Sequence, residues 1–203
     1  SYAIYMPKYD VVNVDPKSPG GIKFDKIIGG VPYTKELLGK INKFVVLTLF
    51  QQTNPEEQRK HESDTVHISI KDFIGAEAVS YMNNKINVSA VYLDGYRGDL
   101  KWEFTSLMYH EFTHLLSWYG NQASPSPSAV QEGIADYAIL KANYFPPAFA
   151  KPGSGDKWDQ GYDFTARFYE YCDSITPGFV AKFNKKMKDT FNVNSFKEIT
   201  GKP

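Results

Sequence analysis

Two kinds of hydrophobic periodicity run along the chain. Apolar and polar side chains alternate over residues 66–70, which predicts a half-buried strand. Two further strands are predicted over residues 76–81 and 86–90. The residues between them, Asn83 and Asn84, tolerate positive φ and therefore favour a hairpin turn. Strands are thus expected in the first half of the chain.

Helical spacing of apolar residues governs most of the remaining sequence. Residues 1–30 are expected to be irregular or partly stranded, and Thr34 then caps a first helix that ends near Gln52. A largely buried helix follows the strands and stops near Gly120. Further helices are predicted from Ser128 to about Asn143, over residues 161–172, from Pro177 to about Lys188, and from Ser195. This order predicts an α+β fold, in which a small N-terminal mixed sheet with a helix precedes a mainly helical C-terminal half.

The overall composition excludes several classes of partner. The 23 basic and 23 acidic residues give a formal net charge of zero, so neither nucleic acid nor an anionic membrane is expected to bind. No stretch approaches about 18 uninterrupted apolar residues, so no membrane-spanning helix is predicted. The single cysteine, Cys172, is expected to be a small buried apolar residue. We expect a monomer with one catalytic domain over residues 1–203, in which residues 1–120 form a sheet-bearing lobe and residues 121–203 a helical lobe.

The strongest chemical signal is the sequence His110-Glu111-Phe112-Thr113-His114 in the predicted buried helix. Histidines four residues apart lie on one face of a helix, so both imidazoles can bind one zinc ion at about 2.0–2.1 Å. Glu111 lies on the adjoining edge, where its carboxylate can reach a zinc-bound water without being a ligand. This spacing predicts a catalytic zinc site in which Glu111 activates that water.

A catalytic zinc ion needs a third protein ligand, and Glu132 is the candidate. It lies 18 residues after His114, in the next predicted helix, where a loop can return it to the first helix. Asp136 is one turn further and is placed to accept the outer N–H of a ligand imidazole, most plausibly that of His110. The alternative is that Glu132 and Asp136 are solvated carboxylates. The apolar neighbours of these carboxylates, which need a core-facing side, favour the ligand interpretation.

The other two histidines are interpreted as lying outside the metal site. His61 falls in a charged stretch typical of a solvated loop or helix end, and His67 lies on a predicted strand beside Ser69.

Hydrolysis at such a site also needs a second group that stabilises the oxyanion, and substrate is expected to bind at an exposed sheet edge. Tyr162 is the candidate for the first role because it begins the helix after the ligand helix, although core packing explains it equally well. The predicted edge strand comprises Ala76, Glu77, Ala78, Val79, Ser80 and Tyr81. An extended peptide added to this edge would bind through its backbone, so the expected partner is a peptide or protein substrate.

Several segments in the same order resemble the plant basic secretory protein family, which has bacterial and fungal relatives. They are residues 51–55, 109–114, 132–137, 158–163, 165–168 and 178–181. The resemblance extends from about residue 20 to the end of the chain. It implies a secreted protein with a zincin fold, one Zn²⁺ ion and peptidase activity. The Glu132-x-x-x-Asp136 element also resembles the gluzincin pattern, in which the Glu is a ligand and the Asp supports a histidine.

Two other functional classes compete with a zinc metallopeptidase. The first is a secreted zinc-bearing defence or binding protein with weak or lost catalysis, and the intact Glu111 disfavours it. The second is a structural zinc site closed by a fourth ligand, usually Cys, and no Cys lies near the motif. The sequence pI near 6.9 departs from the basic character that the family name implies, so a role based on positive charge is not expected.

Overall fold

The computed structural model describes residues 3–203, which form eight α-helices and a four-stranded mixed sheet. The predicted α+β class is confirmed. The chain forms two compact units. Unit 1 takes the described residues up to Tyr5 together with residues 43–59 and 116–203, and unit 2 takes residues 6–42 and 60–115.

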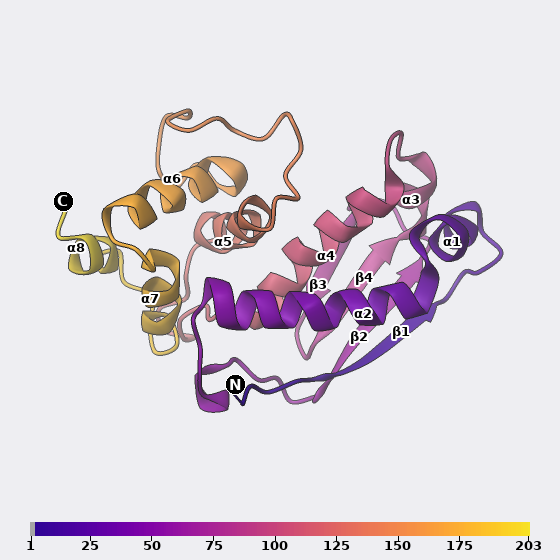
Figure 1. Ribbon diagram of the computed structural model, residues 1–203, viewed down its shortest axis with the longest axis horizontal. Coiled ribbons are helices and arrows are strands. Elements are labelled where there is room, and N and C mark those ends of the chain that lie inside the picture. Colours follow the sequence, from indigo (N-terminus) through magenta and orange to yellow (C-terminus); the bar gives the residue numbers. More distant parts are fainter. Residues whose placement is uncertain (1–2) are drawn as a thin grey trace. The chain divides into compact units, whose positions relative to one another are not determined.

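The sheet belongs to unit 2 and has the strand order β1-β2-β4-β3 (Figure 1). Its strands are β1 (Lys8–Asn13), β2 (Thr65–Lys71), β3 (Ala78–Tyr81) and β4 (Lys85–Ser89). The first three in this order are parallel, and β3 pairs antiparallel with β4 at the edge. The predicted strand at 66–70 is confirmed as β2, in which the even-numbered apolar residues are buried. The predicted turn is also confirmed, since Asn83 and Asn84 have φ of 63° and 64°.

Two helices of unit 2 pack on the sheet beside each other. They are α2 (Gly30–Lys43) and α4 (Leu100–Leu116). Tyr9 on β1 contacts both helices, because its ring meets Phe112 edge-on at 6.2 Å and its hydroxyl donates to the Leu38 carbonyl. The hydroxyls of Tyr33 and Thr105 lie 2.6 Å apart and join α2 to α4. The helix that carries the His-Glu-x-x-His motif is therefore held by both the sheet and α2.

The N-terminal region is more helical than the sequence pattern predicts. The segments that precede α2 are α1 (Pro19–Lys23), capped by Ser18, and a π-helical turn (Phe24–Ile28). Thr34 lies inside α2, where its hydroxyl donates to the Gly30 carbonyl, so its prediction as the N-cap is wrong. A second π-helical segment (Phe44–Leu49) and a 3₁₀ turn (Pro55–Glu57) follow α2, and α3 (Ala90–Gly95) follows β4.

Unit 1 is built around the helices of the C-terminal half. They are α5 (Ser128–Lys141), α6 (Tyr162–Ile175), α7 (Phe179–Lys186) and α8 (Ser195–Thr200). Tyr169 lies at the centre of this core, where its hydroxyl donates to the Val130 carbonyl and its ring stacks on Phe179. Cys172 is buried as predicted, and burial raises the pKa of its thiol to about 12.

Gly133 sets the spacing between α5 and α6. A Cβ at this position would lie 2.4 Å from Cγ2 of Thr165 and 3.0 Å from the Tyr169 ring. We expect Gly133→Ala to lower the free energy of unfolding by about 1–3 kcal/mol because the two helices must separate. Urea unfolding followed by circular dichroism measures this change.

Gly39 provides the matched control within α2. A Cβ there has no neighbouring atom within 4 Å, so Gly39→Ala is expected to raise the free energy of unfolding by about 0.5–1 kcal/mol through reduced backbone entropy. Equal effects of the two substitutions would contradict the assignment of Gly133 as a packing glycine.

Candidate metal centre

The two histidines of the motif face each other across one turn of α4. Their Nε2 atoms are 3.2 Å apart, and their rings are almost perpendicular at 81° with centroids 4.9 Å apart. Two nitrogens bound to one tetrahedral zinc ion at 2.0–2.1 Å lie about 3.3–3.4 Å apart. The separation of the imidazole nitrogens therefore fits a shared metal ion.

The carboxylate that completes the group is Glu132 on α5. One ligand atom each from His110, His114 and Glu132 lie within 4.8 Å of one another, so these residues could hold a metal ion. His114 is buried, whereas His110 and Glu132 are partly exposed. Two imidazoles and one carboxylate form a donor set used by catalytic zinc sites, which leave a fourth position open.

The remaining predicted site residues lie on the same helices or begin the next one. Glu111 on α4 and Asp136 on α5 are both buried residues, each 8% exposed. Asp136 is one helical turn beyond Glu132, as the i, i+4 spacing requires. Tyr162 is the first residue of α6 and has a φ of 49° and an exposed ring. The catalytic and supporting roles of these three residues remain predictions.

The predicted edge strand is shorter than the sequence pattern indicates. β3 begins at Ala78, so Ala76 and Glu77 precede it, although the Glu77 carbonyl accepts a hydrogen bond from the Ser89 N–H. Within the described sheet, the side of β3 opposite β4 has no partner strand. An edge without a partner strand carries backbone donors and acceptors of the kind that a further strand can pair with.

A group of acidic and phenolic side chains near His110 was missed by the sequence interpretation. Burial and the Glu103 carboxylate raise the pKa of Glu77, while the His110 imidazole acts in the opposite direction. The Tyr92 hydroxyl donates to Glu103, and burial followed by this hydrogen bond raises the pKa of Tyr92. Glu103 lies seven residues before His110, and this spacing places both side chains on one face of α4. That spacing was the sequence signal from which the proximity of Glu103 to His110 was predictable.

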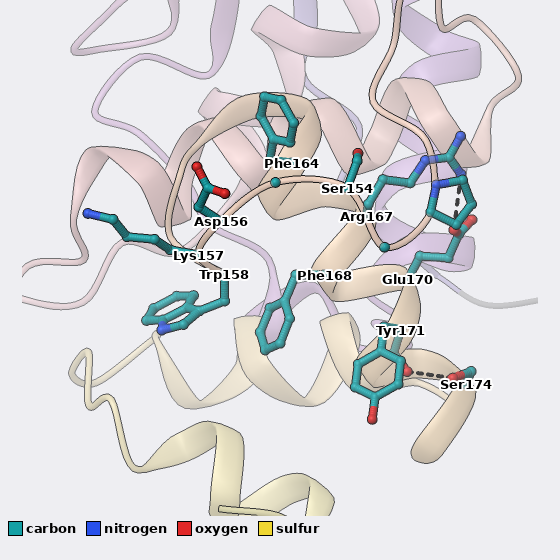
Figure 2. A pocket seen from close by; sticks show the side chains of 13 residues that line it. Ser154, Asp156, Lys157, Trp158, Phe164, Arg167, Phe168, Glu170, Tyr171 and Ser174 are labelled. Carbon is teal, nitrogen blue, oxygen red and sulfur yellow. Dashed lines mark hydrogen bonds and ion pairs between the residues drawn. The ribbon is translucent and has the colours of Figure 1, made fainter.

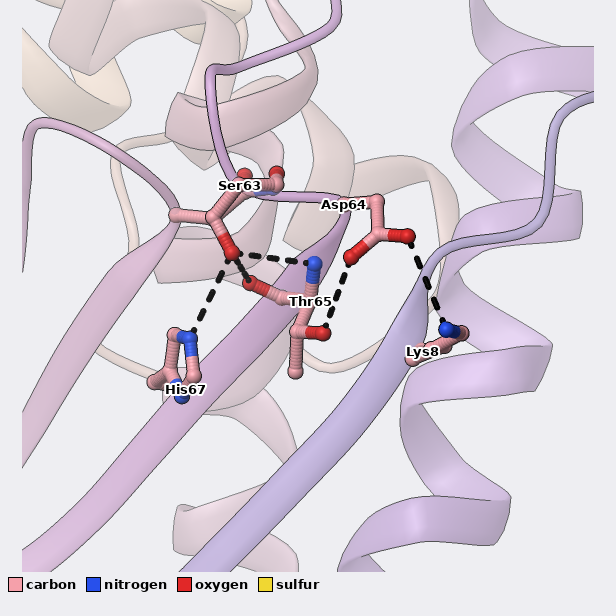
Figure 3. A network of polar contacts seen from close by, with 6 residues as sticks. Lys8, Ser63, Asp64, Thr65 and His67 are labelled. Carbon is pink, nitrogen blue, oxygen red and sulfur yellow. Dashed lines mark hydrogen bonds and ion pairs between the residues drawn. The ribbon is translucent and has the colours of Figure 1, made fainter.

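The other two histidines lie in separate hydrogen-bonded networks. His67 on β2 has Nε2 at 3.4 Å from the Ser63 hydroxyl (Figure 3). Its Nδ1 lies 3.2 Å from the Asp10 carboxylate. His61 has Nε2 at 2.8 Å from the Leu115 carbonyl, so that nitrogen carries the proton. Neither belongs to the metal-binding group among residues 3–203.

Comparison with known proteins identifies the class of this chain. A family model described as peptidase of plants and bacteria matches residues 6–203, and the chain belongs to that family. A stretch of 30 residues is 53% identical to a basic secretory protease of Boswellia serrata. That match covers 15% of this chain and 47% of the relative, so it spans about half the relative's length. No solved structure matches the chain.

These comparisons confirm the family resemblance, whereas the zincin assignment of the fold stays a prediction. Within residues 3–203, every helix is too short or too polar to cross a membrane.

Proposed function

We propose that this protein is a secreted zinc metallopeptidase that hydrolyses peptide bonds. The observation that carries the proposal is the group formed by His110, His114 and Glu132, in which the imidazole nitrogens are 3.2 Å apart. Membership of a family described as peptidases supports the reaction class. The name of the Boswellia serrata relative, a basic secretory protease, supports secretion.

Zinc is the metal that best suits this donor set. Two neutral imidazoles and one carboxylate are typical of catalytic zinc, whereas magnesium and calcium prefer sites made of oxygen ligands. When bound, zinc lowers the pKa of a coordinated water toward 7 and polarises the scissile carbonyl.

The chain's own side chains supply the proton transfers and the positioning. Glu111 accepts the proton of the attacking water and later donates it to the leaving amine. Asp136 accepts the outer N–H of a ligand imidazole and so holds that ring in the tautomer that binds metal. Tyr162 is assigned to donate its hydroxyl proton to the developing oxyanion.

The free edge of β3 is assigned to substrate binding. Residues 78–81 present backbone donors and acceptors on the side opposite β4. An extended peptide can pair with them as an additional strand, which selects for extended backbone rather than for a particular sequence.

Removal and replacement of the metal tests this proposal. Protein purified without chelator is expected to contain about one zinc ion per chain and to cleave members of a broad peptide library. Dialysis against a chelator should abolish cleavage, and one equivalent of zinc should restore it. Elemental analysis measures the metal, and mass spectrometry of the library measures cleavage.

Two outcomes would contradict the proposal. Full zinc occupancy without cleavage of any peptide would favour a zinc-bearing binding protein, whereas undiminished cleavage after complete metal removal would exclude metal-dependent hydrolysis.

A further inference from the structure

A pocket lies in unit 1, between α6 and the loop that precedes it. It has a volume of about 530 Å³ and is lined by loop residues 152–158 and by side chains of α6 (Figure 2). Pockets of about 300–1,000 Å³ are the usual size for small ligands. The proposed peptidase mechanism uses none of the residues that line this pocket.

The pocket lies on the face of α6 that is turned away from α5. Thr165 and Tyr169 of α6 contact Gly133, so they mark the face that packs on the helix of Glu132. Successive residues of a helix are rotated by roughly 100°, so Phe164 and Tyr171 project from roughly the opposite side. The pocket is therefore distinct from the surroundings of Glu132.

The walls of the pocket are held in place before any ligand binds. The loop is tied to α6 because the Ala150 N–H donates to Asp163 at 2.9 Å and the Ala150 carbonyl accepts from Arg167 at 2.7 Å. Gly155 approaches the Phe164 ring so closely that a Cβ would lie 2.7 Å from it. A preformed pocket avoids the entropic cost of ordering a loop when a ligand binds.

Three aromatic side chains form a broad apolar wall. The rings of Trp158 and Phe168 have centroids 5.7 Å apart, and those of Phe168 and Tyr171 are 6.5 Å apart (Figure 2). The charges that line the pocket are balanced, because Arg167 pairs with Glu170 at 3.0 Å and Lys157 offsets the charge of Asp156. The wall therefore suits a ligand that has a wide apolar face and no net charge.

Polar groups at the rim have spare hydrogen-bonding capacity. Within the described part of the chain, the Trp158 indole N–H, the Tyr171 hydroxyl and the Asp156 carboxylate have no hydrogen-bond partner. The indole N–H is a donor, the carboxylate is an acceptor, and the hydroxyl can act as either. A wholly apolar ligand would use the aromatic wall and leave these groups unused.

We propose that this pocket binds a neutral carbohydrate. A pyranose ring presents C–H groups on its faces, which can pack on the rings of Trp158, Phe168 and Tyr171. Its hydroxyls lie around the edge and both donate and accept hydrogen bonds, which matches the groups at the rim. The volume admits more than a single side chain and suits a short oligosaccharide.

Titration with neutral oligosaccharides tests the proposal. The probes are hexamers of β-1,4-linked glucose, β-1,4-linked N-acetylglucosamine and α-linked mannose, and calorimetry measures their binding to the full chain. At least one is expected to bind saturably at millimolar concentration or below. Trp158→Ala and Tyr171→Ala should each weaken that binding about tenfold or more, since each removes part of the aromatic wall.

Tyr81→Ala is the matched control, because Tyr81 is an exposed tyrosine outside the pocket. The Tyr81→Ala variant should leave sugar affinity unchanged. The Glu111→Gln variant should also keep its sugar affinity, so the binding result does not depend on whether the peptidase proposal is correct. Circular dichroism confirms that each variant is folded. Absence of binding by all three sugars, or unchanged affinity in folded Trp158→Ala and Tyr171→Ala, would overturn the proposal. Binding in the pocket of an aromatic dipeptide in place of any sugar would also overturn it.

Discussion

Replacement of Glu111 by Gln is expected to leave the zinc content unchanged while it lowers the turnover of peptide cleavage by about 10²–10⁴-fold. Glutamine has nearly the same shape but cannot accept a proton at neutral pH, so the substitution removes general base catalysis, which contributes an effect of this size. Glu111 is not one of the three residues of the candidate metal centre, so its replacement should leave the metal bound. Elemental analysis and steady-state kinetics on one peptide substrate measure the two quantities.

Glu36→Gln is the matched control for this substitution. Glu36 lies on α2 and forms an exposed ion pair with Lys40, so its amide variant is expected to cleave at the wild-type rate. A Glu111→Gln variant that retains wild-type turnover would remove Glu111 from the mechanism. Loss of zinc together with turnover would instead assign Glu111 to the support of the metal site.

Replacement of His114 by Ala is expected to abolish both zinc binding and cleavage. His114 is buried and offers one of the three ligand atoms of the candidate metal centre, so under the proposed function its loss leaves two ligands, fewer than a stable catalytic site uses. The midpoint of thermal unfolding should also stop responding to added zinc, because a ligand that binds only the folded state stabilises it. Differential scanning calorimetry with and without zinc measures this response.

His67→Ala is the control for the loss of an imidazole elsewhere in the chain. His67 on β2 contacts Asp10 of β1 and Ser63, which precedes β2, and it lies outside the candidate metal-binding group found among residues 3–203. Its variant is expected to keep zinc, cleavage and the zinc-dependent shift of the unfolding midpoint. Full zinc affinity in His114→Ala would show that the ligand assignment is wrong.

The strongly periodic elements were predictable from sequence, and the irregular ones were not. β2 alternates cleanly because Val66, Ile68 and Ile70 all face the core. Residues 1–30 were expected to be irregular or partly stranded, but the bounds of β1 were not predictable, because Val11 is its only buried residue and its alternation is weak. The Pro19-Gly20-Gly21 sequence is typical of a turn, yet it lies in the helix α1. Gly20 of this helix packs closely on the Ala90 backbone, a contact that the sequence pattern does not reveal.

The start of α7 shows how a contact can override a local signal. The sequence pattern predicts a helix from Pro177, yet α7 begins at Phe179. Gly178, with a φ of 80°, donates its N–H to the Asp173 side chain at the end of α6. A sequence pattern cannot reveal this bond, because α6 must first be folded and placed.

The candidate site likewise has parts that the sequence reveals and parts that only the folded structure brings together. The i, i+4 spacings within His110–His114 and Glu132–Asp136 are local, so they were visible in the sequence. The carboxylates of Glu77 and Glu103 approach each other only because the sheet and α4 are packed together. The aromatic pocket likewise depends on the loop before α6, whose path carries no periodic signal.

The unpaired side of β3 also affects how the protein behaves at high concentration. Backbone donors and acceptors that can pair with a peptide can pair equally well with the same strand of another molecule, which is the usual origin of edge-to-edge aggregation. β3 limits this hazard by its length, because four residues offer few ladder hydrogen bonds. Under the proposed function, solubility and substrate binding thus place opposite demands on the length of this strand.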